Sequence, residues 1–263
     1  MSVESSVTSR LERRTAAWWT LLIITLAIVA AWPPETGRSL AVKVLNWAVD
    51  PDDRLPVLPP QLGYGVGDDP AIVEARDAEV RRAVREQVRN GANQIKIMAG
   101  GGISSPTDPI DGTQYGLAEL AAICEEAEAA NTYVMAHAYS PRSITRAVRA
   151  GVRSIEHGNL LDADSARVMK EEGAFLVPTL ATYAVLEQEG QRLGWSAAML
   201  AKLERVGRRG LEALAIARAE GIPIAFGTDL LGHMHDRQLT EFALRGRVQS
   251  PAEVLQGATA VAA

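Results

Sequence analysis

The chain has 263 residues, 47% of them hydrophobic, which is long enough for one large domain with a packed core or for two small ones. Its 27 basic and 32 acidic residues give a net charge of -5 without a basic stripe, which excludes nucleic acid as the main partner. The single cysteine, Cys124, can form no disulfide within the chain and is interpreted as a small core residue.

The first part of the chain, residues 1–36, reads as a hydrophobic leader. Residues 15–34 carry no charge, tryptophans lie near both ends of this run, and arginines precede it. These features favour a single membrane span or an uncleaved signal sequence, and therefore a membrane-anchored protein. The alternative is a buried hydrophobic helix in a cytoplasmic protein. Residues 37–67 are interpreted as an irregular segment in which residues 39–48 could supply one strand.

From residue 68 to residue 263 the pattern alternates between helix and strand. Five expected helices, the last of them a long one over residues 196–220, each end at a glycine or asparagine that precedes a strand. The five residues are Gly91, Asn131, Gly151, Gly173 and Gly221. Glycine and asparagine most readily adopt the left-handed conformation that ends helices. Such alternation predicts an α/β fold with parallel strands and helical crossovers.

Four polar residues lie near the carboxyl ends of these expected strands: Lys96, His137, His157 and Asp229. In a β/α barrel that end carries the active site, and an open doubly wound sheet also binds ligands there. Each residue has an ordinary structural explanation, such as a helix cap for Asp229. Together on one rim, however, two imidazoles and a carboxylate form a ligand set suited to zinc or a similar divalent ion.

Lys96 lies in a short apolar run, "IKIM", that has the pattern of a buried strand. An ammonium group there would lose its hydration, unless the long side chain extended to water. A Schiff-base aldolase would also use a lysine at a strand end, but it would not need the histidines and the aspartate. The "GGG" at residues 100–102 is not followed by a helix, so a phosphate or dinucleotide cradle is disfavoured.

Five segments in order, "IKIMAGGG", "MAHAYSP", "SIEHG", "LVPTL" and "FGTD", resemble the amidohydrolase superfamily. The closer resemblance is to its imidazolonepropionase-like branch, which includes metal-dependent prolidases, and it covers about residues 60–263. It implies a partial (β/α)8 TIM-type barrel of the metal-dependent hydrolase kind, lacking the first strands and the C-terminal β-region. It also implies hydrolysis of a C–N bond in a small dipeptide-like or N-acyl amino acid substrate.

The resemblance assigns roles to individual residues. Lys96 would be carboxylated by carbon dioxide, and its carbamate would bridge two divalent ions, of which zinc is the first choice. His137 and His157 would bind the more exposed ion. Asp229 would bind the other ion and act as the catalytic proton shuttle. Tyr183, in "PTLATY", would contact a substrate carboxylate, with a helix-face tyrosine as the alternative.

The sequence departs from the family pattern because it has no histidine before His137, so the His-x-His pair of the first strand is absent. This predicts at most one tightly bound ion, and the alternative reading is a catalytically inactive truncated or frame-disrupted remnant, possibly membrane-associated. An incomplete barrel would also expose a strand edge and favour a homo-oligomer or aggregation. His233 and His235 have His-x-His spacing, which would place both on one side of an extended strand. They are interpreted as substrate-facing, with a replacement metal pair or an ordinary exposed loop as alternatives.

Overall fold

A computed structural model describes residues 70–105, 108–190 and 192–262. For residues 70–75, at the start of the first helix, it describes the backbone but not the side chains. The chain divides into two units, residues 1–53 and 54–263, and every described residue belongs to the second unit. The proposed span and the strand expected earlier in the chain both lie outside the described residues.

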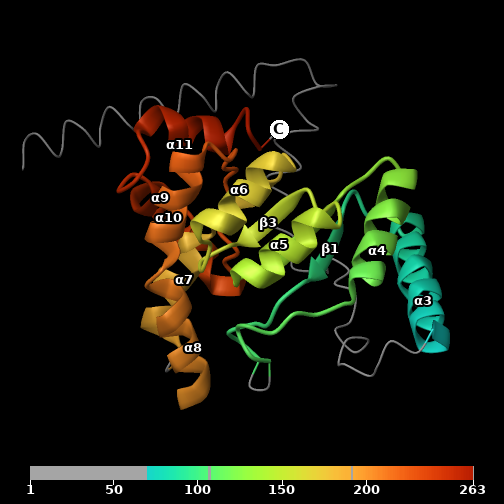
Figure 1. The fold of residues 1–263 in the computed structure, drawn as a ribbon. Coiled ribbons are helices and arrows are strands. Elements are labelled where there is room, and N and C mark those ends of the chain that lie inside the picture. Colours follow the sequence, from blue (N-terminus) through green and yellow to red (C-terminus); the bar gives the residue numbers. More distant parts are fainter. Residues whose placement is uncertain (1–69, 106–107, 191, 263) are drawn as a thin grey trace, which may run out of the picture. The chain divides into compact units, whose positions relative to one another are not determined.

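Strands and helices alternate through the described unit (Figure 1). The strands are β1 (Ile95–Met98), β2 (Val134–Ala138), β3 (Ser154–His157) and β4 (Phe175–Val177). The helices are α3 (Pro70–Arg89), α4 (Leu117–Ala129), α5 (Pro141–Arg149), α6 (Ala163–Glu171), α7 (Leu180–Glu189), α8 (Ala197–Gly207), α9 (Gly210–Glu220), α10 (Thr240–Arg245) and α11 (Pro251–Ala258), with a 3-10 helix, η2 (Gly232–Arg237).

The four strands form one parallel sheet in the order β1-β2-β3-β4. A further extended segment continues the sheet beyond β4, because Leu176 and Ile224 form a parallel bridge. Two backbone hydrogen bonds, from Leu176 N to Pro223 O and from Ala225 N to Leu176 O, hold this segment in place. The arrangement confirms the predicted α/β fold and its sequential parallel strands.

The helix ends confirm the sequence pattern in detail. All five predicted stop residues have positive φ, between 56° at Asn131 and 106° at Gly151. The long helix expected over residues 196–220 is instead two helices, α8 and α9, separated by Arg208 and Arg209. The next residue, Gly210, packs so tightly that a Cβ atom there would lie 2.7 Å from Leu180 Cδ2. Close packing therefore explains the glycine at the start of α9.

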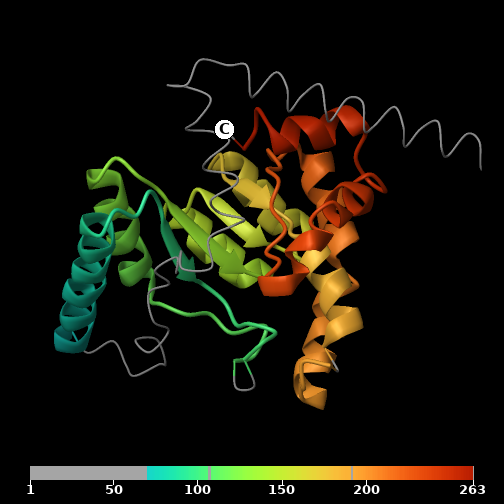
Figure 2. The same ribbon diagram turned by 180° about the vertical axis from the view of Figure 1, so that it is seen from behind.

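The two faces of the sheet have different chemistry. Ile95, Ile97 and Ile155 are fully buried in one apolar core with residues of the surrounding helices. Because side chains alternate along a strand, the opposite face carries Lys96 of β1 and, two positions further along the neighbouring strands, the register pair His137 and Glu156. Lys96 is only partly buried because it lies on this second face, whereas the sequence pattern indicated a buried strand. Figure 2 shows the sheet from behind.

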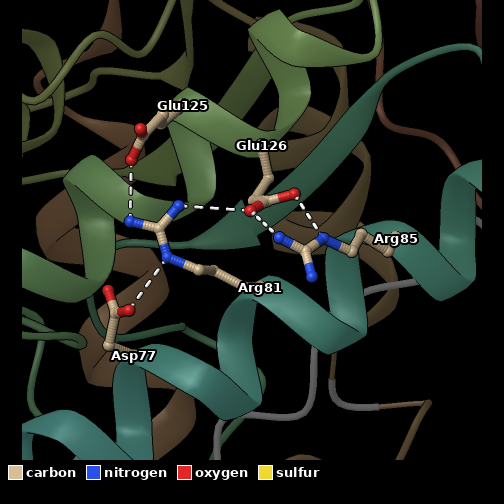
Figure 3. Close-up of polar contacts among 5 residues, drawn as sticks. All are labelled: Asp77, Arg81, Arg85, Glu125 and Glu126. Atoms are coloured by element: carbon tan, nitrogen blue, oxygen red, sulfur yellow. Dashed lines mark hydrogen bonds and ion pairs between the residues drawn. The ribbon is translucent and has the colours of Figure 1, made fainter.

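Helices α3 and α4 pack side by side and share a network of ion pairs (Figure 3). Arg81 of α3 contacts Asp77 on its own helix and reaches Glu125 and Glu126 on α4, at 2.7 Å and 3.2 Å. Arg85 donates two hydrogen bonds to Glu126. The guanidinium groups lower the pKa of Glu126 below its usual value. These charges lie at the surface, so the apolar residues beneath them dominate the packing of the two helices.

Two expectations need correction. The membrane-anchored localisation is withdrawn, because no helix in the described part of the chain is long and apolar enough to cross a bilayer; residues 15–34 themselves lie outside that part. His233 and His235 are in the 3-10 helix η2 and not in an extended strand. With three residues per turn, side chains two positions apart point in different directions, so the geometric reason for pairing them is lost.

Candidate functional site

Two histidines from neighbouring strands lie against each other at the carboxyl end of the sheet. His137 is in β2 and His157 is the last residue of β3, and their ring centroids are 4.6 Å apart. Both are buried, with exposed fractions of 7% and 5%. His157 has a φ of 77°, a left-handed conformation that non-glycine residues rarely adopt. This turn at the strand end lets consecutive residues depart from the alternation that the pleat imposes.

Each ring has one nitrogen held by the protein. The carbonyl oxygen of Gly101 lies 3.0 Å from Nε2 of His137, and since a carbonyl only accepts, Nε2 must donate. The neutral ring then presents Nδ1 without its proton. In His157 the held nitrogen is Nδ1, which is 2.7 Å from Oγ1 of Thr179. Fixing one nitrogen by a protein contact orients the other toward a ligand, as in metal-binding histidines.

Burial keeps both imidazoles neutral. Desolvation, together with the positive charge of Lys96, lowers the pKa of His137 to about 4, although the hydrogen bond to the Gly101 carbonyl opposes the shift. Desolvation, then the neighbouring His137 and Lys96, lower the pKa of His157 well below its usual value. Neutral imidazole is the form that binds metal ions. The two rings are therefore in their ligand form at neutral pH.

Two carboxylates complete the charged part of the site. Burial raises the pKa of Asp229 to about 6, Lys96 opposes the shift, and Glu156 reinforces it. Asp229 is exposed to solvent, which screens these effects. Burial also raises the pKa of Glu156, whose Oε1 accepts a 2.6 Å hydrogen bond from Ser154. Lys96 thus interacts electrostatically with both histidines and both carboxylates.

Two buried tyrosines adjoin the histidines. The ring of Tyr139 is 4.6 Å from that of His137 and 5.4 Å from that of His157. The hydroxyl of Tyr183 donates to the hydroxyl of Tyr139 over 3.2 Å. Burial raises the pKa of both Tyr139 and Tyr183 well above the usual value of tyrosine, so both hydroxyls remain protonated. The Tyr139 proton is therefore left to donate to another group.

An apolar cluster supports this rim, and it is separate from the core between sheet and helices. It joins the loop after β1, helices α7 and α8, and the segment after Asp229. Its buried members are Ile103, Ile110, Tyr139, Ala181, Tyr183, Val185, Leu186, Leu203, Val206, Leu230 and Met234. Tyr183 thus belongs to a packed cluster and presents its hydroxyl to the histidine side.

The sequence-predicted residues divide into two groups. His137, His157, Lys96 and Asp229 interact electrostatically, and Tyr183 lies beside His157 at a centroid distance of 6.1 Å. His233 is exposed and His235 is partly exposed on η2. Within the described residues no three His, Cys, Asp or Glu side chains have metal-binding geometry. Lysine is not among those ligand types. The roles of Lys96, His137, His157, Asp229 and Tyr183 therefore stay predictions.

Sequence reasoning missed three residues that contact or influence the predicted ones. Tyr139 lies two residues after His137, a spacing that places both on the same side of a strand. Glu156 directly precedes His157, and its register opposite His137 could be read only from the strand pairing. Thr179 stands in the "LVPTL" segment, but nothing in that pattern indicates a contact with His157.

Comparison with known proteins identifies the family of the chain. The sequence model of a family described as "Amidohydrolase family" matches residues 34–263, beginning earlier than the resemblance at about residue 60. Ochratoxinase of Aspergillus niger is 35% identical over 209 residues, which cover 78% of this chain and 42% of ochratoxinase. The chain therefore spans less than half the length of this relative.

Solved structures show the same relationship. A prolidase complexed with N-methylphosphonate-L-proline is 55% identical, with a TM-score of 0.68 over 70% of this chain and 45% of that chain. A Xaa-Pro dipeptidase with bound methionine is 31% identical, with a TM-score of 0.63 over 70% and 46% of the two chains. The crystal structure of A. niger ochratoxinase gives 36% identity and a TM-score of 0.62, over 70% and 42%.

Proposed function

Because the chain belongs to the amidohydrolase family, we propose that it cleaves the amide bond of a small dipeptide-like or N-acyl amino acid substrate with the help of a divalent metal ion. The observation that carries the proposal is the packed pair of neutral histidines within electrostatic reach of Lys96 and Asp229. The prolidase and Xaa-Pro dipeptidase among the similar structures favour substrates with a carboxyl-terminal proline.

The side chains present fit such an ion. His137 would bind it through Nδ1 and His157 through Nε2, the ring nitrogens that their protein contacts leave free. Lys96 would add a carbamate oxygen once carbon dioxide has reacted with its amine, and Asp229 would offer a carboxylate oxygen to a second ion. Nitrogen and oxygen ligands of this kind suit zinc. When bound, a divalent ion acidifies water and polarises a carbonyl group.

The chain's own residues supply the proton transfers and the substrate contacts. Asp229, with its raised pKa, accepts the proton of the attacking water and returns it to the leaving nitrogen. Tyr139 and Tyr183 remain protonated; Tyr183 donates to Tyr139, and Tyr139 donates its own proton to the substrate carboxylate. The apolar cluster behind the tyrosines excludes water from this side of the site. A proline or acyl group would pack against it.

The second candidate is an inactive member of the family. It is favoured by one observation, the absence of any histidine before His137. Without the first-strand pair, the buried ion would keep only Asp229 and the Lys96 carbamate, whereas catalytic zinc usually has three protein ligands. An ion held by the two histidines and the carbamate would still have three. We therefore expect one tightly bound ion per chain and weak hydrolysis.

Metal analysis combined with turnover tests this proposal. The purified chain is loaded with zinc and bicarbonate, its metal content is measured by mass spectrometry, and Xaa-Pro dipeptides and N-acyl amino acids are offered. Lys96→Met should lose both the ion and turnover. Lys170→Met is the matched control, because Lys170 is an exposed residue of α6 paired only with Glu220 at 3.7 Å. Absence of turnover, with or without a bound ion, would contradict the proposal and select the inactive alternative.

A further inference from the structure

Three backbone carbonyls of one loop converge on a single ammonium group. The loop connects β1 to α4 and is described over residues 99–105 and 108–116; it is called the β1 loop here. Nζ of Lys202, on α8, donates to the carbonyls of Ser105 over 2.8 Å and of Gly102 over 3.4 Å. It also donates to the carbonyl of Asp108. Such charge-assisted bonds are stronger than bonds between neutral groups.

The β1 loop contacts the candidate site near its start. Gly101 is the neighbour of Gly102, and its carbonyl accepts the hydrogen bond from Nε2 of His137. The backbone here is closely folded, because a Cβ atom on Gly101 would lie 1.9 Å from the carbonyl oxygen of Pro109. A bridge between Gly100 and Thr113 closes the base of the loop. The direction of the Gly101 carbonyl therefore depends on how the whole loop is held.

Apolar contacts and one surface ion pair also attach the loop to α8. Ile103 and Ile110 are buried in the same cluster as Leu203, the residue after Lys202. Arg205 makes two hydrogen bonds to Asp111 at 2.8 Å and 2.9 Å, but both residues are exposed. These contacts seat the loop without choosing the direction of a carbonyl. The three bonds of Lys202, by contrast, are made to carbonyl groups of the loop backbone itself.

We propose that Lys202 is a positioning residue that, through the carbonyls of the β1 loop, sets the Gly101 carbonyl against Nε2 of His137 and so leaves Nδ1 of that ring free to bind a ligand. Removal of Lys202 takes away the one ammonium group that the three carbonyls share, and the carbonyl oxygens then repel one another and turn apart. Gly101 moves with Gly102, and Nε2 of His137 loses its fixed acceptor. The ring then exchanges its proton between the two nitrogens, and a fraction of the molecules presents a protonated Nδ1.

The assignment of a metal to Nδ1 rests on the proposed function, but the tautomer of His137 does not. The chain has only four histidines, so each imidazole can be assigned by replacing it with glutamine. Long-range 1H–15N spectra of the uniformly labelled, metal-free chain report the tautomer of each ring. We expect the Nε2–H form at His137 in the wild type and in Arg208→Met. The latter is the control, because Arg208 is the exposed residue directly after α8 and pairs with Glu204 of that helix.

Lys202→Met should convert the His137 signals to those of a tautomer mixture. It should also weaken zinc binding, measured by competition with a chelating dye, by about tenfold, as loss of a ligand's supporting partner does. Lys202→Arg keeps the charge and the donors and should restore most of both properties. If Lys202→Met does not fold, Lys202→Gln takes its place with the same expectation.

The proposal is overturned if Lys202→Met, folded by its circular dichroism and thermal transition, keeps the wild-type tautomer of His137. It is also overturned if Lys202→Met and Arg208→Met change the tautomer equally, since that result assigns the effect to general loosening of α8. Failure of the proposed function has a different signature. In that case wild-type chain binds no zinc and hydrolyses no amide, while the tautomer difference between the variants persists.

Discussion

Thr179 shows how one residue can serve the site at the expense of its own helix. It directly precedes α7, a position where threonine commonly caps the helix with its side-chain oxygen. Here that oxygen is bonded to His157, and Thr179 makes no capping bond. Glu241 of α10 replaces it by accepting the amide hydrogen of Ala181 over 2.7 Å. The cap of α7 is thus supplied by a residue 60 positions away in the sequence.

The buried carboxyl of Glu241 makes stability depend on pH. Desolvation raises its pKa from 4.5 to about 8, although the Ala181 amide and Arg245 oppose the shift. A raised pKa means that the folded protein binds the proton more tightly than the unfolded chain does. The contribution is therefore present below pH 4.5 and is lost as the pH rises through about 8.

We expect Glu241→Gln to be more stable than the wild type at pH 9 by a few kcal/mol, on the order of the cost of burying a charge, and similar to it at pH 5. Urea unfolding at both values measures the difference. Comparing the two proteins cancels the titration of the histidines and of Asp229. Equal dependence on pH in both proteins would show that Glu241 does not titrate in this range.

At the residue scale, sequence could predict the polar residues that follow strands but not their contacts. His137, His157 and Asp229 stand out because apolar strands precede them. Glu156 becomes informative only once its register opposite His137 is known. Lys202 is indistinguishable in sequence from other helix-surface lysines, and its partners are 94 to 100 residues away. Contacts between distant segments leave no local pattern.

At the scale of elements, glycine is used where helices approach other backbone closely. Gly257 of α11 is one such position, because an added Cβ would lie 2.7 Å from the carbonyl oxygen of Ile224 and 2.8 Å from Nη2 of Arg245. Arg245 in turn donates to the carbonyls of Ile224 and Ala225 at 3.3 Å and 3.0 Å. The helix, the buried arginine and the strand segment therefore form one tightly packed unit.

Gly257→Ala should lower the free energy of unfolding by about 1–3 kcal/mol, the usual cost of overpacking. Gly207 provides a matched control within another helix, since its added Cβ would make an ordinary 3.5 Å contact with Cβ of Tyr183. Gly207→Ala should be neutral or stabilising by up to about 1 kcal/mol, because alanine favours helix. Denaturant unfolding of both variants measures the two changes in the free energy of unfolding. Equal effects would mean that the packing around Gly257 relaxes without cost.

Element prediction succeeded where a local signal was present. The five left-handed residues that end helices were all identified, since only glycine and asparagine adopt that conformation readily. The start of α5 also carries a local signal, because the side chain of Ser140 caps the helix and Pro141 is its first residue. The break between α8 and α9 was missed because it depends on the packing of Gly210 against Leu180. The helical reading of η2 was missed because His-x-His spacing alone does not distinguish a strand from a turn.

At the scale of the whole molecule, a bound ion should link the site to stability. The candidate ligands come from β1, β2, β3 and the segment after Ile224, so an ion bound to them stabilises only the folded chain. Zinc at one hundred times its dissociation constant should stabilise the wild type by about 2.7 kcal/mol. The double variant His137→Gln, His157→Gln should show no comparable gain.

Thermal unfolding with and without zinc, each in the presence of bicarbonate, measures this linkage. Lys170→Met serves again as the surface control and should gain as much as the wild type. A gain in the double histidine variant would place the ion elsewhere in the molecule.

The family and the α/β architecture could be predicted from ordered motifs along the chain, because each motif combines a strand with the residues that follow it. The membrane anchor was inferred from an uncharged run with flanking arginines and tryptophans, and it is withdrawn because no helix in the described part of the chain is long and apolar enough to cross a bilayer.

The separation of the sheet into two faces has a consequence for laboratory evolution. Substitutions at Ile95, Ile97 or Ile155 alter contacts with the helices, whereas those at Lys96, His137 or Glu156 alter the charged face. At the three isoleucine positions, aliphatic residues of similar volume should replace one another with little effect. At the three positions of the charged face, few other residues should be tolerated. A randomised library of these strands should therefore yield survivors whose diversity alternates from one position to the next.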